Sequence, residues 1–260
     1  MIFDKIIYIN LDRRPDRNLN VIEQLKKVGL EKITERFSAI DGKKLDLNNY
    51  DTNIITPRGI EFARKSEIIY THLTLGAIGC AESHRAIYQK IIDENINSCL
   101  ILEDDITFDD KFNEKLKYIE NDIKVNNKIN NNYDLFFLGF HPGTTYDESM
   151  RYKTVYGLFG YIVTKSGAKK LLNLFPITYQ IDTEITRNTD KINIYGVKYS
   201  ERLILSDQSQ YSYKFGTDIQ NKNEGVNEVN GKTNIYIALF IIVFVIVCII
   251  ITIRIILKNK

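Results

Sequence analysis

Three consecutive carboxylates, Glu103, Asp104 and Asp105, directly follow a short apolar run at residues 98–102. Such a run, bounded by polar residues, predicts a buried strand, and ligands of open α/β sheets gather outside the carboxyl ends of strands. Adjacent negative charges at a sheet edge repel one another, so a divalent cation or a cationic partner would compensate them. Ligands that are all oxygen favour Mg²⁺, Mn²⁺ or Ca²⁺ over Zn²⁺. A solvated acidic turn is the alternative interpretation.

An arginine cluster lies at the start of the first expected helix: Arg13, Arg14 and Arg17. The helix is predicted at residues 15–28, opened by Pro15 and stopped by Gly29. A guanidinium can bind two phosphate oxygens at once, and a helix N-terminus adds backbone donors. The cluster therefore indicates a phosphate site, with a solvated basic loop as the alternative.

Further candidates occur later in the chain. His84 lies in a helix predicted at residues 74–92, where a single histidine is more often a packed residue than a catalyst. Asp182 and Glu184 follow Pro176 and add two more acids.

An alternation of strands and helices must position these residues. Strands are predicted at residues 5–11, 37–40, 98–102, 133–138 and 157–164. Helices are predicted at 15–28, 74–92, 109–129 and 167–174, the last capped by Ser166. The segment 141–156 is expected to be a flexible loop beside the site, and residues 43–65 allow no assignment. The order predicts an α/β fold with βαβ units.

Composition narrows the class of protein. The 260 residues are 44% hydrophobic, which suits one globular domain with a full core. A net charge of +2 gives no basic footprint for nucleic acid. The three cysteines, Cys80, Cys99 and Cys248, are odd in number and widely spaced, so we expect neither a disulfide framework nor a zinc site, and a reducing compartment.

The C-terminal part of the chain predicts a membrane anchor. Residues 235–253 are uniformly apolar, and as a helix they would extend roughly 28 Å, close to the thickness of a bilayer core. We expect a catalytic domain at 1–217, a polar linker at 218–232, a transmembrane helix at 233–257 and a short basic tail at 258–260. A buried core helix is the alternative. No signal peptide is visible, which predicts a single-pass, tail-anchored membrane protein with a cytosolic domain.

Four ordered motifs, at residues 9–17, 76–84, 100–105 and 157–172, together resemble glycosyltransferase family 25, which includes lipooligosaccharide and collagen galactosyltransferases. The likeness covers roughly residues 4 to 215. The resemblance implies a GT-A-like, Rossmann-type domain that binds a nucleotide sugar, a Mn²⁺ or Mg²⁺ ion, and inverting transfer. The expected reaction moves a hexose, galactose or glucose, from a UDP-sugar to a glycan, lipid-linked or protein hydroxyl acceptor such as hydroxylysine.

The resemblance and the residue types together assign roles. Glu103 and Asp105 are expected to hold the metal, and Asp182, with Glu184 as second choice, to act as the base. The expected donor-binding residues are Asn10, Arg13, Arg14, Arg17, Ser83, His84 and Asp104. Two other functions stay open: a catalytically inactive, membrane-tethered glycan-binding or scaffold module, and a metal-dependent phosphoester hydrolase.

Overall fold

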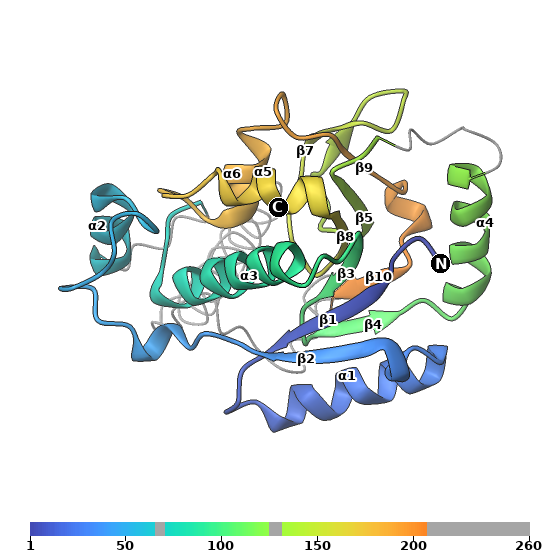
Figure 1. The fold of residues 1–260 in the computed structure, drawn as a ribbon, viewed down its shortest axis with the longest axis horizontal. Helices are drawn as coiled ribbons and strands as arrows, with labels where there is room; N and C mark the ends of the chain where they lie inside the picture. Colours follow the sequence, from blue (N-terminus) through green and yellow to red (C-terminus); the bar gives the residue numbers. More distant parts are fainter. Residues whose placement is uncertain (66–70, 125–131, 207–260) are drawn as a thin grey trace, which may run out of the picture. The chain divides into compact units, whose positions relative to one another are not determined.

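The computed structural model describes residues 1–65, 71–124 and 132–206, all within one compact unit, Met1–Asn221. A six-stranded sheet with the order β2-β1-β3-β8-β5-β9 forms its centre (Figure 1). The strands are β1 Lys5–Asn10, β2 Thr34–Ser38, β3 Ser98–Leu102, β5 Leu135–Gly139, β8 Gly160–Thr164 and β9 Ile194–Gly196. The predicted α/β class is confirmed.

The sheet contains both parallel and antiparallel strand pairs. The predicted βαβ units did not include the antiparallel pairs. β1 pairs in parallel with β2 and β3, and β5 pairs in parallel with β9. β8 is antiparallel to both of its neighbours, β3 and β5. Because no helix lies between β5 and β8, the chain is not carried back to the opposite end of the sheet, and β8 must run against the other strands.

Six helices accompany the sheet in the described part of the chain: α1 Pro15–Val28, α2 Pro57–Lys65, α3 Leu75–Asp93, α4 Phe112–Lys124, α5 Lys165–Leu172 and α6 Ile181–Thr186. α1 ends as predicted, with Gly29 in the left-handed conformation at φ 73°. α3 packs beside α5, and α1 packs against β1 and β4, Ile106–Phe108. α2 occupies the stretch that allowed no assignment.

Three local predictions were wrong in detail. The second strand is Thr34–Ser38, an edge strand whose polar, partly exposed residues hid it from an apolar pattern. The cap of α5 is Thr164, whose hydroxyl accepts the Gly167 amide proton at 3.0 Å, whereas Ser166 lies inside the helix. The segment 141–156 is not only loop, because it holds a hairpin.

The hairpin joins β6 Thr145–Tyr146 to β7 Tyr152–Thr154. Tyr152 is fully buried and stacks on Phe137 of β5, and its hydroxyl donates to the Val197 carbonyl oxygen at 2.7 Å. A second small pair joins β4 Ile106–Phe108 to β10 Ile204–Ser206.

The core surrounds the middle of the sheet, where β3 and β5 are buried almost along their whole length. α3 approaches the short 3₁₀ helix η2, Gly42–Lys44, closely enough that glycine is needed on both sides. A Cβ on Gly79 would lie 2.4 Å from the Ile40 carbonyl oxygen, and one on Gly42 would lie 1.9 Å from the Leu75 carbonyl oxygen. Gly42 and Gly79 therefore set the distance between η2 and α3.

Within the described ranges, no helix combines the length and the apolar character needed to cross a membrane. The predicted linker, transmembrane helix and basic tail, residues 218–260, lie outside those ranges.

Candidate active site

Two polar segments, one after β1 and one after β3, meet at one edge of the sheet. β1 and β3 are adjacent and parallel, with Tyr8 opposite Leu102, so the residues after each strand emerge side by side. The start of β8 lies at the same edge, because Gly160 pairs with Leu102. The Glu103 amide also donates to the Phe159 carbonyl oxygen at 3.3 Å. The sheet topology thus brings the acidic segment, residues 103–105, beside the arginine loop that follows β1.

Asp104 is the centre of a buried polar cluster. Arg17 Nη1 lies 2.8 Å from its Oδ1, and Asn10 Nδ2 donates to its Oδ2 at 2.8 Å. All three side chains are buried. The Asn10 Oδ1 in turn accepts from Arg36 Nε at 2.9 Å. Both oxygens of Asp104 are therefore engaged, and this residue fixes the arginine loop to the acidic segment.

Glu103 and Asp105 carry negative charge that the surrounding protein compensates poorly. Burial, together with the neighbouring Asp104 and Asp182, raises the pKa of Glu103 to about 7, against an opposing effect of Arg17. Burial and the nearby Glu103 raise the pKa of Asp105 to about 7, again opposed by Arg17. Asp105 Oδ1 is buried and accepts no hydrogen bond from the described residues. Two carboxylates in this condition fit a hard divalent cation.

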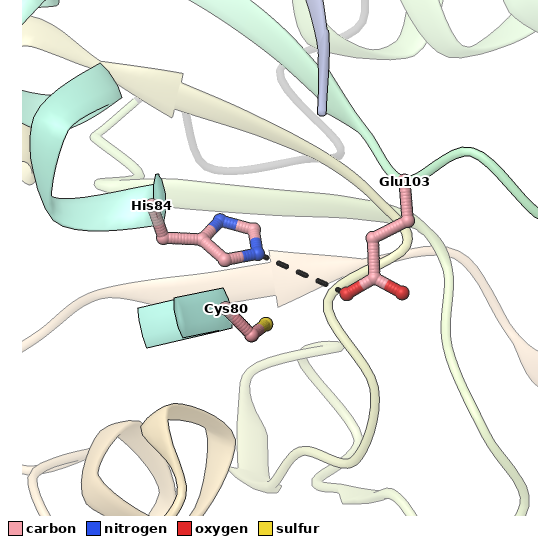
Figure 2. A group of neighbouring side chains, drawn as sticks. All are labelled: Cys80, His84 and Glu103. Carbon is pink, nitrogen blue, oxygen red and sulfur yellow. Dashed lines mark ion pairs between the residues drawn. The ribbon is translucent and has the colours of Figure 1, made fainter. Parts of the chain in front are cut away.

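His84 faces the same acids from α3. Its imidazole is fully buried, and Nδ1 lies 2.7 Å from the Tyr161 hydroxyl, which itself lies 2.8 Å from the Tyr88 hydroxyl. Nε2 points toward Glu103 Oε1 at 3.8 Å, as Figure 2 shows. Burial lowers the pKa of His84 to about 3, so the ring is neutral near pH 7. His84 is both packed in the core and directed at the acidic site.

Cys80 lies with this group, although the spacing of the cysteines gave no indication of a zinc site. Its Sγ, a ring nitrogen of His84 and a Glu103 carboxylate oxygen all lie within 4.8 Å of one another (Figure 2). The prediction considered only pairs of cysteines. The informative signal was the spacing of four between Cys80 and His84, which places both side chains on one face of a helix.

A pocket of about 590 Å³, partly open to solvent, lies over this edge of the sheet. Six predicted site residues line it: Arg13, Arg17, Ser83, His84, Glu103 and Asp104. Asp41, Lys43 and Cys80 also line it and were not predicted. The other predicted residues, Asn10, Arg14, Asp105, Asp182 and Glu184, are not among its lining residues in the described part of the chain.

The three arginines do not converge. Arg13 Nε lies 3.0 Å from Asp41 Oδ2 at the pocket wall, and Arg17 turns inward to Asp104. Arg14 pairs with Asp16 on its own helix, with Nη2 2.7 Å from Oδ2. The part of the cluster that faces the pocket is Arg13 and Arg17.

Ser83 holds the pocket wall together. Its hydroxyl donates to the Gly79 carbonyl oxygen at 2.7 Å and accepts the Ile40 amide proton at 2.9 Å. Because it is fully buried, its visible role is to tie the loop before η2 to α3.

The two acids of α6 differ in their surroundings. Asp182 Oδ2 accepts the Gly157 amide proton at 3.2 Å, and its charge contributes to the raised pKa of Glu103. Glu184 Oε1 accepts the amide protons of Thr178 and Tyr179 at 2.8 and 2.9 Å. Asp182 is thus electrostatically coupled to the acidic site, whereas Glu184 holds the turn that enters α6.

Fold and site together define an α/β protein with a pocket, lined by acidic and basic side chains, at the carboxyl edge of strands β1 and β3. The sequence matches the family described as "Glycosyltransferase family 25 (LPS biosynthesis protein)" over residues 3–185. The chain belongs to glycosyltransferase family 25.

Curated relatives carry the family name. A glycosyltransferase 25 family member of Drosophila pseudoobscura pseudoobscura is 32% identical over 186 residues, which are 67% of this chain and 28% of the relative. Procollagen galactosyltransferase 2 of Mus musculus is 30% identical over the same shares of the two chains. A protein of Rattus norvegicus named probable inactive glycosyltransferase 25 family member 3 is 26% identical over 67% of this chain and 31% of its own length. The chain thus spans less than a third of these relatives.

Among solved structures, a glycosyltransferase involved in glycosylation of the major capsid of PBCV-1 aligns over 78% of this chain and 92% of its own, with 12% identity and a TM-score of 0.38.

Proposed function

We propose that this chain is a glycosyltransferase that moves a hexose, galactose or glucose, from a UDP-sugar to a hydroxyl of a glycan, lipid-linked or hydroxylysine-type acceptor. The observation that carries the proposal is a pair of carboxylates, the partly buried Glu103 and the buried Asp105, beside a pocket with Arg13 and Arg17 in its wall. Family membership and relatives named as galactosyltransferases support the same reaction class.

The donor would lie in the pocket described above, where Arg13, Arg17 and Glu103 line the wall. Arg13 and Arg17 would contact the diphosphate through their planar forks. Asn10 and Asp104 would act indirectly, since they hold Arg17 in place. Ser83 and His84 shape the wall, and Arg14 has the weakest claim to a donor contact.

A Mn²⁺ or Mg²⁺ ion would be held by Glu103 and Asp105. The chemistry that the ion supplies is neutralisation of the charge on the leaving diphosphate. The protein fits such an ion because Glu103 and Asp105 lie together at the end of β3, and Asp105 Oδ1 is buried and accepts no hydrogen bond from the described residues.

Inversion would follow from direct attack by the acceptor. The acceptor oxygen forms a bond to the anomeric carbon as the bond from that carbon to the diphosphate oxygen breaks, and the hydroxyl proton passes to a carboxylate. Asp182 is the proposed base because its charge acts on the acidic site. Glu184 is less suited, because two backbone amides already bind its Oε1.

The proposal also includes a fold subclass and a membrane span. The mixed sheet with its site at the carboxyl edge supports a GT-A-like domain. The apolar run at 235–253 supports a single membrane span.

One alternative has a specific observation in its favour. A relative named as probably inactive shows that family likeness and activity can separate, so a tethered, inactive binding module is the second candidate. The acids of the site argue for activity, because a buried carboxylate such as Asp105, with one oxygen that accepts no hydrogen bond from the described residues, is costly unless it binds something.

The test uses the full chain in detergent and a panel of nucleotide sugars, with and without Mn²⁺, assayed for release of the nucleoside diphosphate. Metal-dependent release from one donor is expected, and Asp105→Asn should abolish it. Asp110→Asn is the matched control, since Asp110 is a 91% exposed partner of Lys27 outside the pocket. A folded protein that turns over no donor would favour the inactive module, whereas phosphate release from simple esters would favour the hydrolase.

A further inference from the structure

The proposed transferase gives Cys80 no role and uses His84 only to shape the pocket wall. Its metal and donor chemistry uses oxygen ligands and arginines, while Cys80 and His84 present a sulfur and a ring nitrogen to the same space (Figure 2). Sulfur and imidazole nitrogen are the ligands that zinc prefers, and they are poor ligands for Mg²⁺ or Mn²⁺.

The geometry around His84 points to a ligand. The imidazole is fully buried, yet Nε2 makes no hydrogen bond with any residue in the described ranges. A buried polar nitrogen without a partner is costly, so such atoms usually mark a binding role. The nitrogen is directed at Glu103, and Cys80 lies one helical turn before His84 on the same face of α3.

The spacing of the three ligand atoms is close to that of a metal centre. Tetrahedral zinc, with bonds of about 2.0–2.3 Å, holds its ligand atoms about 3.3–3.7 Å apart. His84 Nε2 and Glu103 Oε1 already lie 3.8 Å apart, and all three ligand atoms lie within 4.8 Å of one another. Cys80 and Glu103 are only partly buried, so small side-chain movements can close the remaining gap.

We propose that Cys80, His84 and Glu103 form a binding site for a thiophilic divalent cation, Zn²⁺ in particular, with a fourth position open to the pocket. The site differs in ligand chemistry from the one proposed for Mn²⁺ or Mg²⁺ and shares only Glu103 with it.

A hydrogen-bonded chain behind the histidine supports the assignment. A ligating imidazole needs its other nitrogen to donate, which fixes the ring and its tautomer. The Tyr161 hydroxyl can accept a hydrogen bond from His84 Nδ1 at 2.7 Å and donate one to the Tyr88 hydroxyl at 2.8 Å. Either atom of each contact can be the donor, so this arrangement is allowed. In that arrangement the lone pair of Nε2 faces Cys80 and Glu103. Tyr161 is thus a positioning residue for the metal.

Sharing Glu103 has a consequence that rests on the proposed function. A zinc ion bound to Glu103 withdraws it from the oxygen site, so Zn²⁺ and Mn²⁺ compete and zinc inhibits the transferase. The metal-binding claim stands apart from this, because it is tested by spectroscopy without any sugar donor.

The experiment is a Co²⁺ titration of the full chain in detergent, since a cobalt–thiolate bond gives a charge-transfer absorption in the near ultraviolet. The decisive variant carries Cys99→Ala and Cys248→Ala, which leaves Cys80 as the single cysteine of the chain. The absorption is expected in this variant, and addition of Zn²⁺ should remove it. Cys80→Ser in the wild-type background should lose it.

Three further variants test the ligand set. Tyr161→Phe should lower the affinity for Zn²⁺ roughly 10–100-fold while the charge-transfer band at saturation is retained. Asp105→Asn should retain the cobalt band, because Asp105 belongs only to the oxygen site, whereas Glu103→Gln should weaken it. Absence of the band from the folded single-cysteine protein, or its persistence in Cys80→Ser, would overturn the proposal, whatever the outcome of the transferase assay.

Discussion

Adjacent acids in one tripeptide experience three different environments. Asp104 is held by Arg17 and Asn10, Glu103 faces His84, and Asp105 keeps a buried oxygen that the described residues leave without a hydrogen bond. The difference arises from neighbours supplied by α1, α3 and β1, since the three residues are identical or nearly identical in chemistry. Sequence position alone therefore cannot distinguish a structural acid from a ligand.

Asp105 should reduce the stability of the metal-free protein at alkaline pH. Its pKa in the folded protein, about 7, lies above the usual value, so the folded protein binds more protons than the unfolded chain between about pH 4 and pH 7. The free energy of unfolding therefore falls as pH rises through this window, and the full cost is present above it. Asp105→Asn should raise the stability at about pH 8 by roughly 2–4 kcal/mol and change it little near pH 4.

Thermal unfolding at the two pH values, without divalent metal, measures this effect. Added Mn²⁺ should then raise the midpoint of the wild-type protein more than that of the variant. A variant that melts below wild type at pH 8 would show that the buried charge is compensated after all.

The ion pair of Asp104 and Arg17 should contribute strongly to stability. Asp104→Asn replaces the charged partner of a buried guanidinium by a neutral amide, and breaking a buried pair of this kind costs roughly 3–5 kcal/mol. Urea unfolding of the full chain measures the loss. Asp110→Asn removes an exposed pair with Lys27 and should cost less than about 1 kcal/mol. Equal losses in the two variants would contradict a special role for the buried pair.

At the scale of elements, the wall of the pocket depends on how closely α3 approaches η2. A Cβ at Gly79 would lie 2.4 Å from the Ile40 carbonyl oxygen and 2.7 Å from the Gly42 amide nitrogen, and both are backbone atoms. Gly79→Ala should therefore push the loop away from the helix, cost about 1–3 kcal/mol and weaken donor binding.

Gly29→Ala provides the comparison for this prediction. A Cβ at Gly29 meets no atom within 4 Å, so its cost comes from the left-handed backbone alone, about 1 kcal/mol, with no effect at the pocket. Melting curves and donor titrations of both variants separate packing from backbone strain. If Gly79→Ala binds donor like wild type, the close approach does not shape the pocket.

The correctly predicted elements are those whose sequence signals lie within the element or at its ends. α1 has its proline start, its glycine stop and an apolar face, and β3 and β5 are uninterrupted apolar runs. β2 was misplaced because an edge strand buries little, and the direction of β8 was missed because strand direction depends on its neighbours. The cap of α5 was assigned to Ser166 because two hydroxyl residues lie within two positions of each other, and the backbone conformation selects Thr164.

For the whole molecule, the site draws on residues from 10 to 182, and that span limits what sequence can predict. The acids and arginines were found by type, because charges after a strand or before a helix are visible in one stretch of chain. The contacts between these residues were not predicted, because Arg17 and Asp104 are 87 positions apart in the sequence. Cys80 was overlooked although its spacing to His84 was visible, because neither residue had a recognised partner in sequence.

The proposed membrane span makes a prediction for the complete chain. We expect the full chain to stay in the membrane fraction after alkaline extraction, and a chain that ends at residue 232 to be released, because the apolar run at 235–253 is then absent. Fractionation followed by immunoblotting measures this. Release of the full chain by alkali would argue for a surface-bound or core segment instead.

The position of β8 also affects the order in which the chain can fold during synthesis. It is the central strand that joins β3 to β5, yet it is made after both. Until residue 164 has left the ribosome, the nascent protein therefore exposes the unpaired, strongly apolar edges of β3 and β5. Such edges attract other chains, so chaperone dependence should be greatest for nascent chains that end just before this strand.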